Sequence, residues 1–138
     1  MKRFIILTTI LLWITLGGFA LYLVNRPVSS VSAEKAAFAL SSNSLYKQFE
    51  ENEESANAKY LGKVVELTGT VKSVETDENG DLTLMLPGDE MFGVSCKLNN
   101  NENKSAKKIQ NGDEVKIKGV CSGKLMDVVL VNCSISRS

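Results

Sequence analysis

Three cysteines are the side chains of this sequence with the most chemical potential. Cys96, Cys121 and Cys133 each lie in a segment where apolar residues alternate with polar ones, and each falls on the apolar side. Such positions predict buried thiols, because free Cys is among the most buried residue types. The sequence has no His and no C-x-x-C pair, so a zinc site is the least favoured interpretation. We therefore expect no metal and no cofactor.

Motifs of catalytic sites are missing from the sequence. It has no nucleophile elbow, phosphate-binding loop or paired-carboxylate signature. A cluster of four glutamates, Glu50, Glu51, Glu53 and Glu54, lacks the ligand spacing of a calcium loop and predicts a solvated helix face. Without His, the side chain that most often moves protons near neutral pH is absent as well. We therefore expect a protein that is not an enzyme.

The elements that must position these side chains follow from apolar periodicity. A helix is predicted from Ser42 or Asn43 to about residue 60, with Leu45, Phe49 and Ala56 on one face. Five strands are predicted after it, over residues 63–74, 82–86, 92–98, 114–121 and 128–135. Gly69 in the first strand indicates a bend, and a short helix is expected near residues 104–110. The order predicts a mainly β fold, a five-stranded closed barrel of the OB type. An open meander would leave the doubly apolar last strand exposed.

The N-terminus predicts a membrane anchor. Residues 4–24 contain no charged side chain and span roughly 31 Å as a helix, close to the hydrocarbon thickness of a bilayer. Lys2 and Arg3 precede this run, which places the N-terminus in the cytoplasm and the domain outside it. A cleaved signal peptide is the alternative, since Gly18-Phe19-Ala20 has the small-x-small pattern of a cleavage site. The predicted organisation is an anchor at 1–24, a linker at 25–41 and a domain at 42–138.

Charge disfavours a nucleic-acid partner. All 16 acidic residues lie beyond Val28, whereas three of the 16 basic residues precede it, so the predicted domain carries about −3. Such a domain lacks the long-range attraction for phosphate on which nucleic-acid binding depends.

Three stretches of the sequence resemble a known family. They are FEENEESANAKYLGKVVELTGTV at 49–71, VSCKL at 94–98 and GDEVKIKGVCSGKLMDVVLVNC at 112–133. They are similar to the tRNA-anticodon-binding-like (tRNA_anti-like) OB-fold family of bacterial envelope proteins, most of unknown function. The resemblance implies an OB fold and no particular activity. The lipobox Cys of lipoprotein members is absent, so a helical anchor is expected instead. The expected location is the bacterial inner membrane, single-pass, with a periplasmic domain.

The OB topology suggests how the cysteines are arranged. In an OB barrel the fifth strand runs parallel to the third, so Cys96 and Cys133 are expected to be neighbours. Outside the cytoplasm such a pair is expected to oxidise, leaving Cys121 as a buried thiol. Three unpaired core thiols remain the alternative.

The candidate binding residues lie on the second, third and fourth predicted strands and in the loop of the last hairpin. They are Met85, Phe92, Lys97, Lys116, Leu125 and Met126. Leu125 and Met126 are apolar residues that a turn does not need, so we expect them to dock either a partner or the preceding helix. This set predicts a binding module for an envelope protein or a small ligand. The alternative is a single-stranded nucleic-acid binder, for which Phe92 is the one aromatic residue on the second and third predicted strands.

Overall fold

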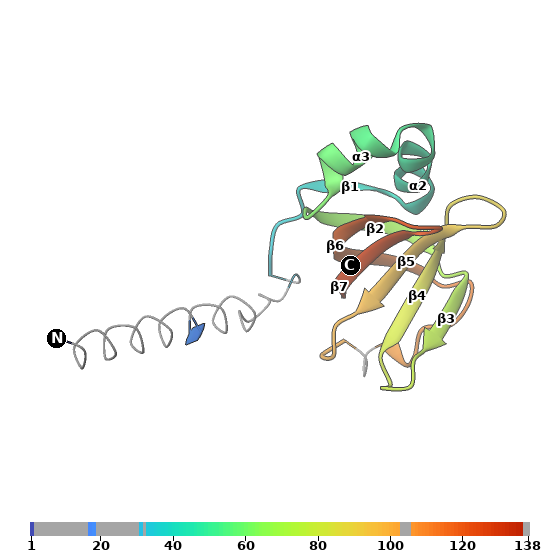
Figure 1. Cartoon of the computed structure of the whole chain (residues 1–138). Helices are drawn as coiled ribbons and strands as arrows, with labels where there is room; N and C mark the ends of the chain where they lie inside the picture. The colour runs from blue at the N-terminus through green and yellow to red at the C-terminus, as the bar shows by residue number, and fades with distance from the viewer. Residues whose placement is uncertain (2–16, 19–30, 32, 103–105, 137–138) are drawn as a thin grey trace.

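The part of the chain that the structure describes forms one β sheet, with the helices α2 and α3 packed on it (Figure 1). This computed structural model describes residues 1, 17–18, 31, 33–102 and 106–136. The elements in chain order are β1 (Phe38–Ser41), α2 (Ser42–Glu51), α3 (Glu53–Tyr60), β2 (Val64–Thr70), β3 (Ser73–Thr76), β4 (Leu82–Pro87), β5 (Gly93–Leu98), β6 (Glu114–Lys124) and β7 (Val128–Ser136).

The closed five-stranded barrel predicted from the sequence is wrong. The sheet has seven strands in the order β1-β2-β6-β7-β5-β4-β3, so its hydrogen-bonded ladder ends at β1 and at β3. The reason lies in the long bent strand predicted over residues 63–74, which is two strands separated by Val71 and Lys72. Val71 N–H donates to the carbonyl of Asp113, whereas Lys72 N–H donates to the carbonyl of Met85, each at 2.8 Å. The chain therefore changes partner there, from the β6 side to β4.

Two strand pairings agree with the expected topology. β5 and β7 are parallel, and β6 and β7 form the antiparallel terminal hairpin. Alternation along β6 predicts that Val115, Ile117 and Cys121 face inward, and all three are buried.

β1 occupies part of the predicted linker. It pairs in parallel with β2, with Phe38 opposite Val65 and Ser41 opposite Thr68. The composition of residues 33–40 favours a helix, but pairing along the edge of β2 supplies tertiary hydrogen bonds that outweigh this weak preference. The strand leads directly into α2.

The single predicted helix is two helices that meet at Asn52. Ser41 caps α2, its Oγ accepting from Ser44 N–H at 3.2 Å. Asn52 ends α2 in an extended conformation and caps α3, its Oδ1 accepting from Ser55 N–H at 2.9 Å. Figure 1 shows both helices together on one side of the sheet, next to β1 and β2.

The helices and the sheet enclose one apolar core. Leu45 and Phe49 of α2 belong to the same buried cluster as Leu67, Leu84 and Ile117 of the strands. Ile109 packs against this cluster from the connection between β5 and β6.

Alternation along β7 predicts Val129, Val131, Cys133 and Ile135 on one face, and this prediction fails at a β-bulge. Gly119 of β6 lies opposite two residues of β7, because Lys118 pairs with Ser134 while Val120 pairs with Val131. Asn132 takes the positive φ of 53° that this bulge requires. The inward residues are therefore Val128, Leu130 and Cys133, and Val131 is 37% exposed.

The predicted transmembrane helix, and the single-pass inner-membrane location with a periplasmic domain that depended on it, are corrected. No helix within the described residues has the length and apolar character to cross a bilayer. α2, with ten residues, is about 15 Å long, half of what a span needs. Residues 2–16 and 19–30 of the predicted anchor and linker lie outside the described part of the chain.

Candidate functional site

The β6–β7 hairpin ends in apolar side chains that face solvent. Leu125 is 88% exposed and Met126 is 67% exposed, and Leu61, just after α3, is 53% exposed. We call Leu61, Leu125 and Met126 the hairpin patch. The sequence allowed Leu125 and Met126 to dock the preceding helix, but side chains this exposed are not packed against α2 or α3.

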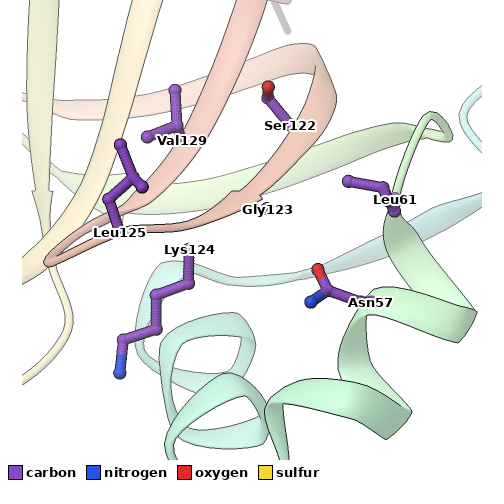
Figure 2. Close-up of a pocket in the computed structure, with 7 residues that line it drawn as sticks. All are labelled: Asn57, Leu61, Ser122, Gly123, Lys124, Leu125 and Val129. Carbon is purple, nitrogen blue, oxygen red and sulfur yellow. The ribbon is translucent and has the colours of Figure 1, made fainter.

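A hollow of about 320 Å³ lies beside the hairpin patch (Figure 2). Its walls come from the end of α3, with Asn57 and Leu61, and from the hairpin, with Ser122 to Leu125 and Val129. Figure 2 shows Asn57 and Leu61 reaching toward Gly123, whereas Lys124 points away toward α2. The Oδ1 atom of Asn57 is buried and has no hydrogen-bond partner among the described residues.

Backbone N–H groups of two neighbouring segments donate to the hairpin and hold it in place. Gly62 N–H donates to the carbonyl of Cys121 at 2.8 Å, which fixes the end of α3 beside β6. Gly93 N–H donates to Asp127 Oδ1 at 2.8 Å, which links the β4–β5 turn to the hairpin. Gly123 has a φ of 101°, a conformation that residues with a Cβ rarely adopt. The hollow is therefore bounded by a hairpin that is held at Cys121 and at Asp127, near its turn.

Charged groups near the hollow are already paired. Lys124 donates to Glu50 and lies 5.2 Å from the centre of the Tyr46 ring, and its side chain is 14% exposed. The hydrogen bond from Lys124 lowers the pKa of Glu50. Burial of Tyr46, followed by its 3.1 Å hydrogen bond to Asp89, raises its pKa to about 12. The Lys124 ammonium is therefore not a free site for an anion.

The β4–β5 face carries two of the predicted binding residues, without an aromatic platform. Met85 is half-buried on β4 and lies between Ser73 of β3 and Ser95 of β5. Phe92 is partly buried and packs against the core rather than standing out from the sheet. Met85 has no ring, and the ring of Phe92, just before β5, packs against the core, so neither residue offers a base a ring to stack on.

The two predicted basic residues each face carboxylates. Lys97 is 3.4 Å from Asp77 and 3.3 Å from Asp81, and hydrogen bonding to Asp81 and then Asp77 raises its pKa. Lys116 of β6 is 3.9 Å from Glu66 of β2. These lysines lie on different strands and are compensated locally, so they do not form a common basic groove.

The six predicted binding residues are thus not assembled into one site. Leu125 and Met126 lie together at the hairpin, while the other four are spread over the sheet and the β4–β5 turn. Sequence reasoning missed Asn57 and Leu61. Asn57 lies in a helix without an apolar stripe, and the only signal for Leu61 is an apolar residue placed directly before a helix-ending glycine.

All three cysteines are free and buried in this structure. Burial, and then the neighbouring Cys96 thiol, raises the pKa of Cys133 well above its ordinary value, and burial raises the pKa of Cys121. Cys96 and Cys133 are therefore neighbours, but Cys133 pairs with Leu98 rather than with Cys96. The described residues contain no cluster of three metal-binding side chains.

The fold has relatives among known proteins. A crystal structure of a Klebsiella pneumoniae lipoprotein proposed to bind nucleic acid matches with a TM-score of 0.59 and 15% identity, over 82% of this chain and 100% of that one. At this identity the likeness concerns the fold alone. Structures of Stn1–Ten1 from S. pombe and from yeast match with TM-scores of 0.44 and 0.47, at 15% and 12% identity. These matches cover 54% and 80% of this chain, and 59% and 68% of the matched chains. At these TM-scores they support no conclusion about this chain.

No curated protein matches the sequence. A family model does match, over residues 1–135, nearly the whole chain. The resemblance found in the sequence is therefore confirmed, and this chain belongs to the tRNA_anti-like family of OB-fold proteins.

Proposed function

We propose that this protein is a non-enzymatic binding module that takes a protein partner at the hairpin patch. The observation that carries the proposal is the exposure of Leu125 and Met126, 88% and 67%, at a hairpin held in place by hydrogen bonds to its neighbours. Large apolar side chains gathered at one exposed place are typical of protein interaction sites. A turn needs neither of them for its own geometry.

The neighbouring charges support a protein partner over a nucleic acid. Binding to single strands relies on free cations along the backbone and on exposed rings that stack on bases. Lys97, Lys116 and Lys124 each lie within ion-pair distance of a carboxylate, and Phe92 packs against the core. A nucleic acid would have to break these ion pairs before it gained its own.

Site-specific photo-crosslinking tests the proposal in cells that make the full chain. A benzoylphenylalanine at Leu125 is expected to crosslink a defined protein, and the same probe at Val131 of β7 serves as the matched surface control. The crosslinked protein is then purified, and its affinity for the full chain is measured directly. Removing either apolar side chain typically costs about 1–2 kcal/mol at a well-packed interface, a five- to thirtyfold loss.

Two results would contradict the proposal. One is that Leu125→Ser and Met126→Ser bind the purified partner as tightly as the unaltered chain does. The other is salt-dependent retention on single-stranded DNA that Lys97→Glu abolishes, because this outcome would favour the nucleic-acid alternative. Val131→Thr keeps a β-branched residue on β7 and is expected to leave binding unchanged.

A further inference from the structure

We infer that the hairpin patch continues onto Met91 of the β4–β5 turn, and that this surface takes a basic segment of the partner protein, in which Lys or Arg side chains accompany apolar ones. The inference rests on the proposed function, because it names the chemistry of the partner expected at the hairpin patch. It adds one contact residue and the sign of the partner's charge.

Met91 lies in the turn next to the β6–β7 hairpin, and its side chain is 77% exposed. β5 and β7 are parallel neighbours, so the turns that precede them lie at the same end of the sheet (Figure 1). The hydrogen bond from Gly93 N–H to Asp127 Oδ1, at 2.8 Å, joins the two turns directly. Met91 lies two residues before the donor and Met126 one residue before the acceptor. One partner can therefore cover both methionines.

The β4–β5 turn holds Met91 in a fixed backbone position. Asp89 Oδ1 accepts from Met91 N–H at 2.8 Å and from Phe92 N–H at 2.6 Å. Asp89 Oδ2 accepts from the hydroxyl of Tyr46 at 3.1 Å, which attaches the turn to α2. A residue whose backbone is already fixed loses little conformational entropy on binding. The unbranched side chain of Met then adapts to the shape of the partner.

Carboxylates outnumber cations around these two turns in the part of the chain that the structure describes. The carboxylates are those of Glu50, Asp89, Glu90 and Asp127, and the ammonium groups are those of Lys72 and Lys124. Lys47, nearby on α2, is offset by Glu51 at 3.8 Å. Glu90 is exposed directly beside Met91. Negative charge around an apolar surface favours a positively charged partner, because complementary potentials steer association and disfavour other partners.

The same charge disfavours other occupants of this surface. A second copy bound through a twofold axis would bring its own carboxylates against these ones, because such a contact uses the same surface on both sides. An anionic lipid surface and a nucleic acid would be repelled for the same reason. A basic polypeptide segment gains both from burying the exposed apolar side chains and from the carboxylates around them.

Peptide selection on the full chain tests this inference. The probe is a phage-displayed library of random twelve-residue peptides, and an enriched peptide is then synthesised for affinity measurement by fluorescence anisotropy. The enriched peptides are expected to combine an excess of Lys and Arg with at least one large apolar residue. Their affinity is expected to fall as the NaCl concentration rises, because salt screens exposed charges.

Variants of the β4–β5 turn separate the apolar contact from the charge. Met91→Ser is expected to weaken binding about five- to tenfold, whereas Met91→Leu keeps an apolar side chain and should stay within about threefold. Glu90→Lys is expected to weaken binding about five- to tenfold and to reduce its salt dependence. The matched control is Glu78→Lys, the same change of charge at an exposed position before the opposite end of β4, which should change affinity by less than about twofold.

The outcomes separate this inference from the function on which it rests. Thermal melting by circular dichroism confirms that each variant is folded. Loss of binding in Leu125→Ser, combined with unchanged binding in Met91→Ser or with equal effects of Glu90→Lys and Glu78→Lys, overturns the inference and leaves the binding module standing. Enriched peptides without an excess of Lys and Arg lead to the same conclusion. Full binding by Leu125→Ser, or no enrichment of any peptide, overturns both.

Two further measurements cover the other occupants. They are cosedimentation of the full chain with phosphatidylglycerol vesicles and its molar mass by light scattering. Vesicle binding that Met91→Ser abolishes would assign the surface to a membrane, and a dimer that Met91→Ser dissociates would assign it to a second copy. Either result overturns the inference.

Discussion

The close packing at the β-bulge makes Gly119→Ala the most informative stability test. A Cβ at this position would lie 2.5 Å from Cys133 Sγ, 3.1 Å from Leu130 Cβ and 3.2 Å from Leu130 Cδ2. Cys133 and Leu130 are fully buried, so neither can turn toward solvent to make room. The substitution must therefore displace β7 relative to β6.

The magnitude follows from two opposing effects. Forcing a methyl group into a packed core costs about 1–3 kcal/mol. Replacing glycine inside a strand returns about 0.5–1 kcal/mol, because alanine has less backbone freedom to lose on folding. The net expectation is a destabilisation of about 1–2 kcal/mol. For a domain of this size that corresponds to a melting temperature lower by roughly 5–15 °C.

A double-mutant cycle measured by urea unfolding, with circular dichroism as the probe, identifies the contact responsible. Cys133→Ala removes the sulfur, so the double variant Gly119→Ala/Cys133→Ala is expected to be more stable than the sum of the single effects by at least about 0.5 kcal/mol. Ser122→Ala, at an exposed position of β6, is the control and should change stability by less than about 0.5 kcal/mol. A Gly119→Ala protein as stable as the unaltered chain, or a coupling energy of zero, would refute the packing described at the bulge.

Four further predictions concern the helices and the thiols. Because the folded pKa of Tyr46, about 12, lies above its ordinary value of 10.0, stability is unaffected by this residue below about pH 10 and falls as the pH rises toward 12. Urea midpoints at pH 9 and pH 11 should therefore fall less in Tyr46→Phe, and an equal fall in both proteins would contradict the assignment. Asn52→Ala removes the cap of α3 and should cost about 1 kcal/mol in urea unfolding, whereas an unchanged midpoint would mean that the cap contributes nothing. Cys121 and Cys133 should react with iodoacetamide far more slowly in the folded protein than in urea, because burial raises their pKa and limits access. The intact mass should be the same with and without reductant. A mass lower by two hydrogen atoms without reductant would instead support the disulfide predicted between Cys96 and Cys133.

Local pattern was sufficient for some elements of the fold. The inward face of β6 could be predicted because charged and apolar residues alternate from Glu114 to Lys118, and period two is all that a strand face requires. Leu125 and Met126 could be identified because the geometry of a turn does not require apolar residues. These predictions depend on neighbours in sequence alone.

Features that depend on distant parts of the chain, or on the backbone conformation of one residue, could not be predicted from local sequence patterns. β1 forms because Phe38 meets Val65 across the sheet, a pairing between residues far apart in sequence. The faces of β7 exchange at Asn132, whose positive φ inserts one residue into the ladder, and alternation cannot reveal that insertion. The hollow depends on the approach of α3 to the hairpin, so Asn57 gave no signal of its own.

The position of β1 has a consequence for how the chain behaves when it is shortened. β2 would be an edge strand without it, and open edges carrying apolar residues are templates for pairing between molecules. β1 pairs with that edge and leaves in its place an edge of only four residues, which is too short to be a good template. A protein trimmed to begin at residue 42, the boundary that the sequence suggests, would retain every element of the hairpin site yet tend to aggregate, whereas one that keeps Phe38 to Ser41 carries its own protection.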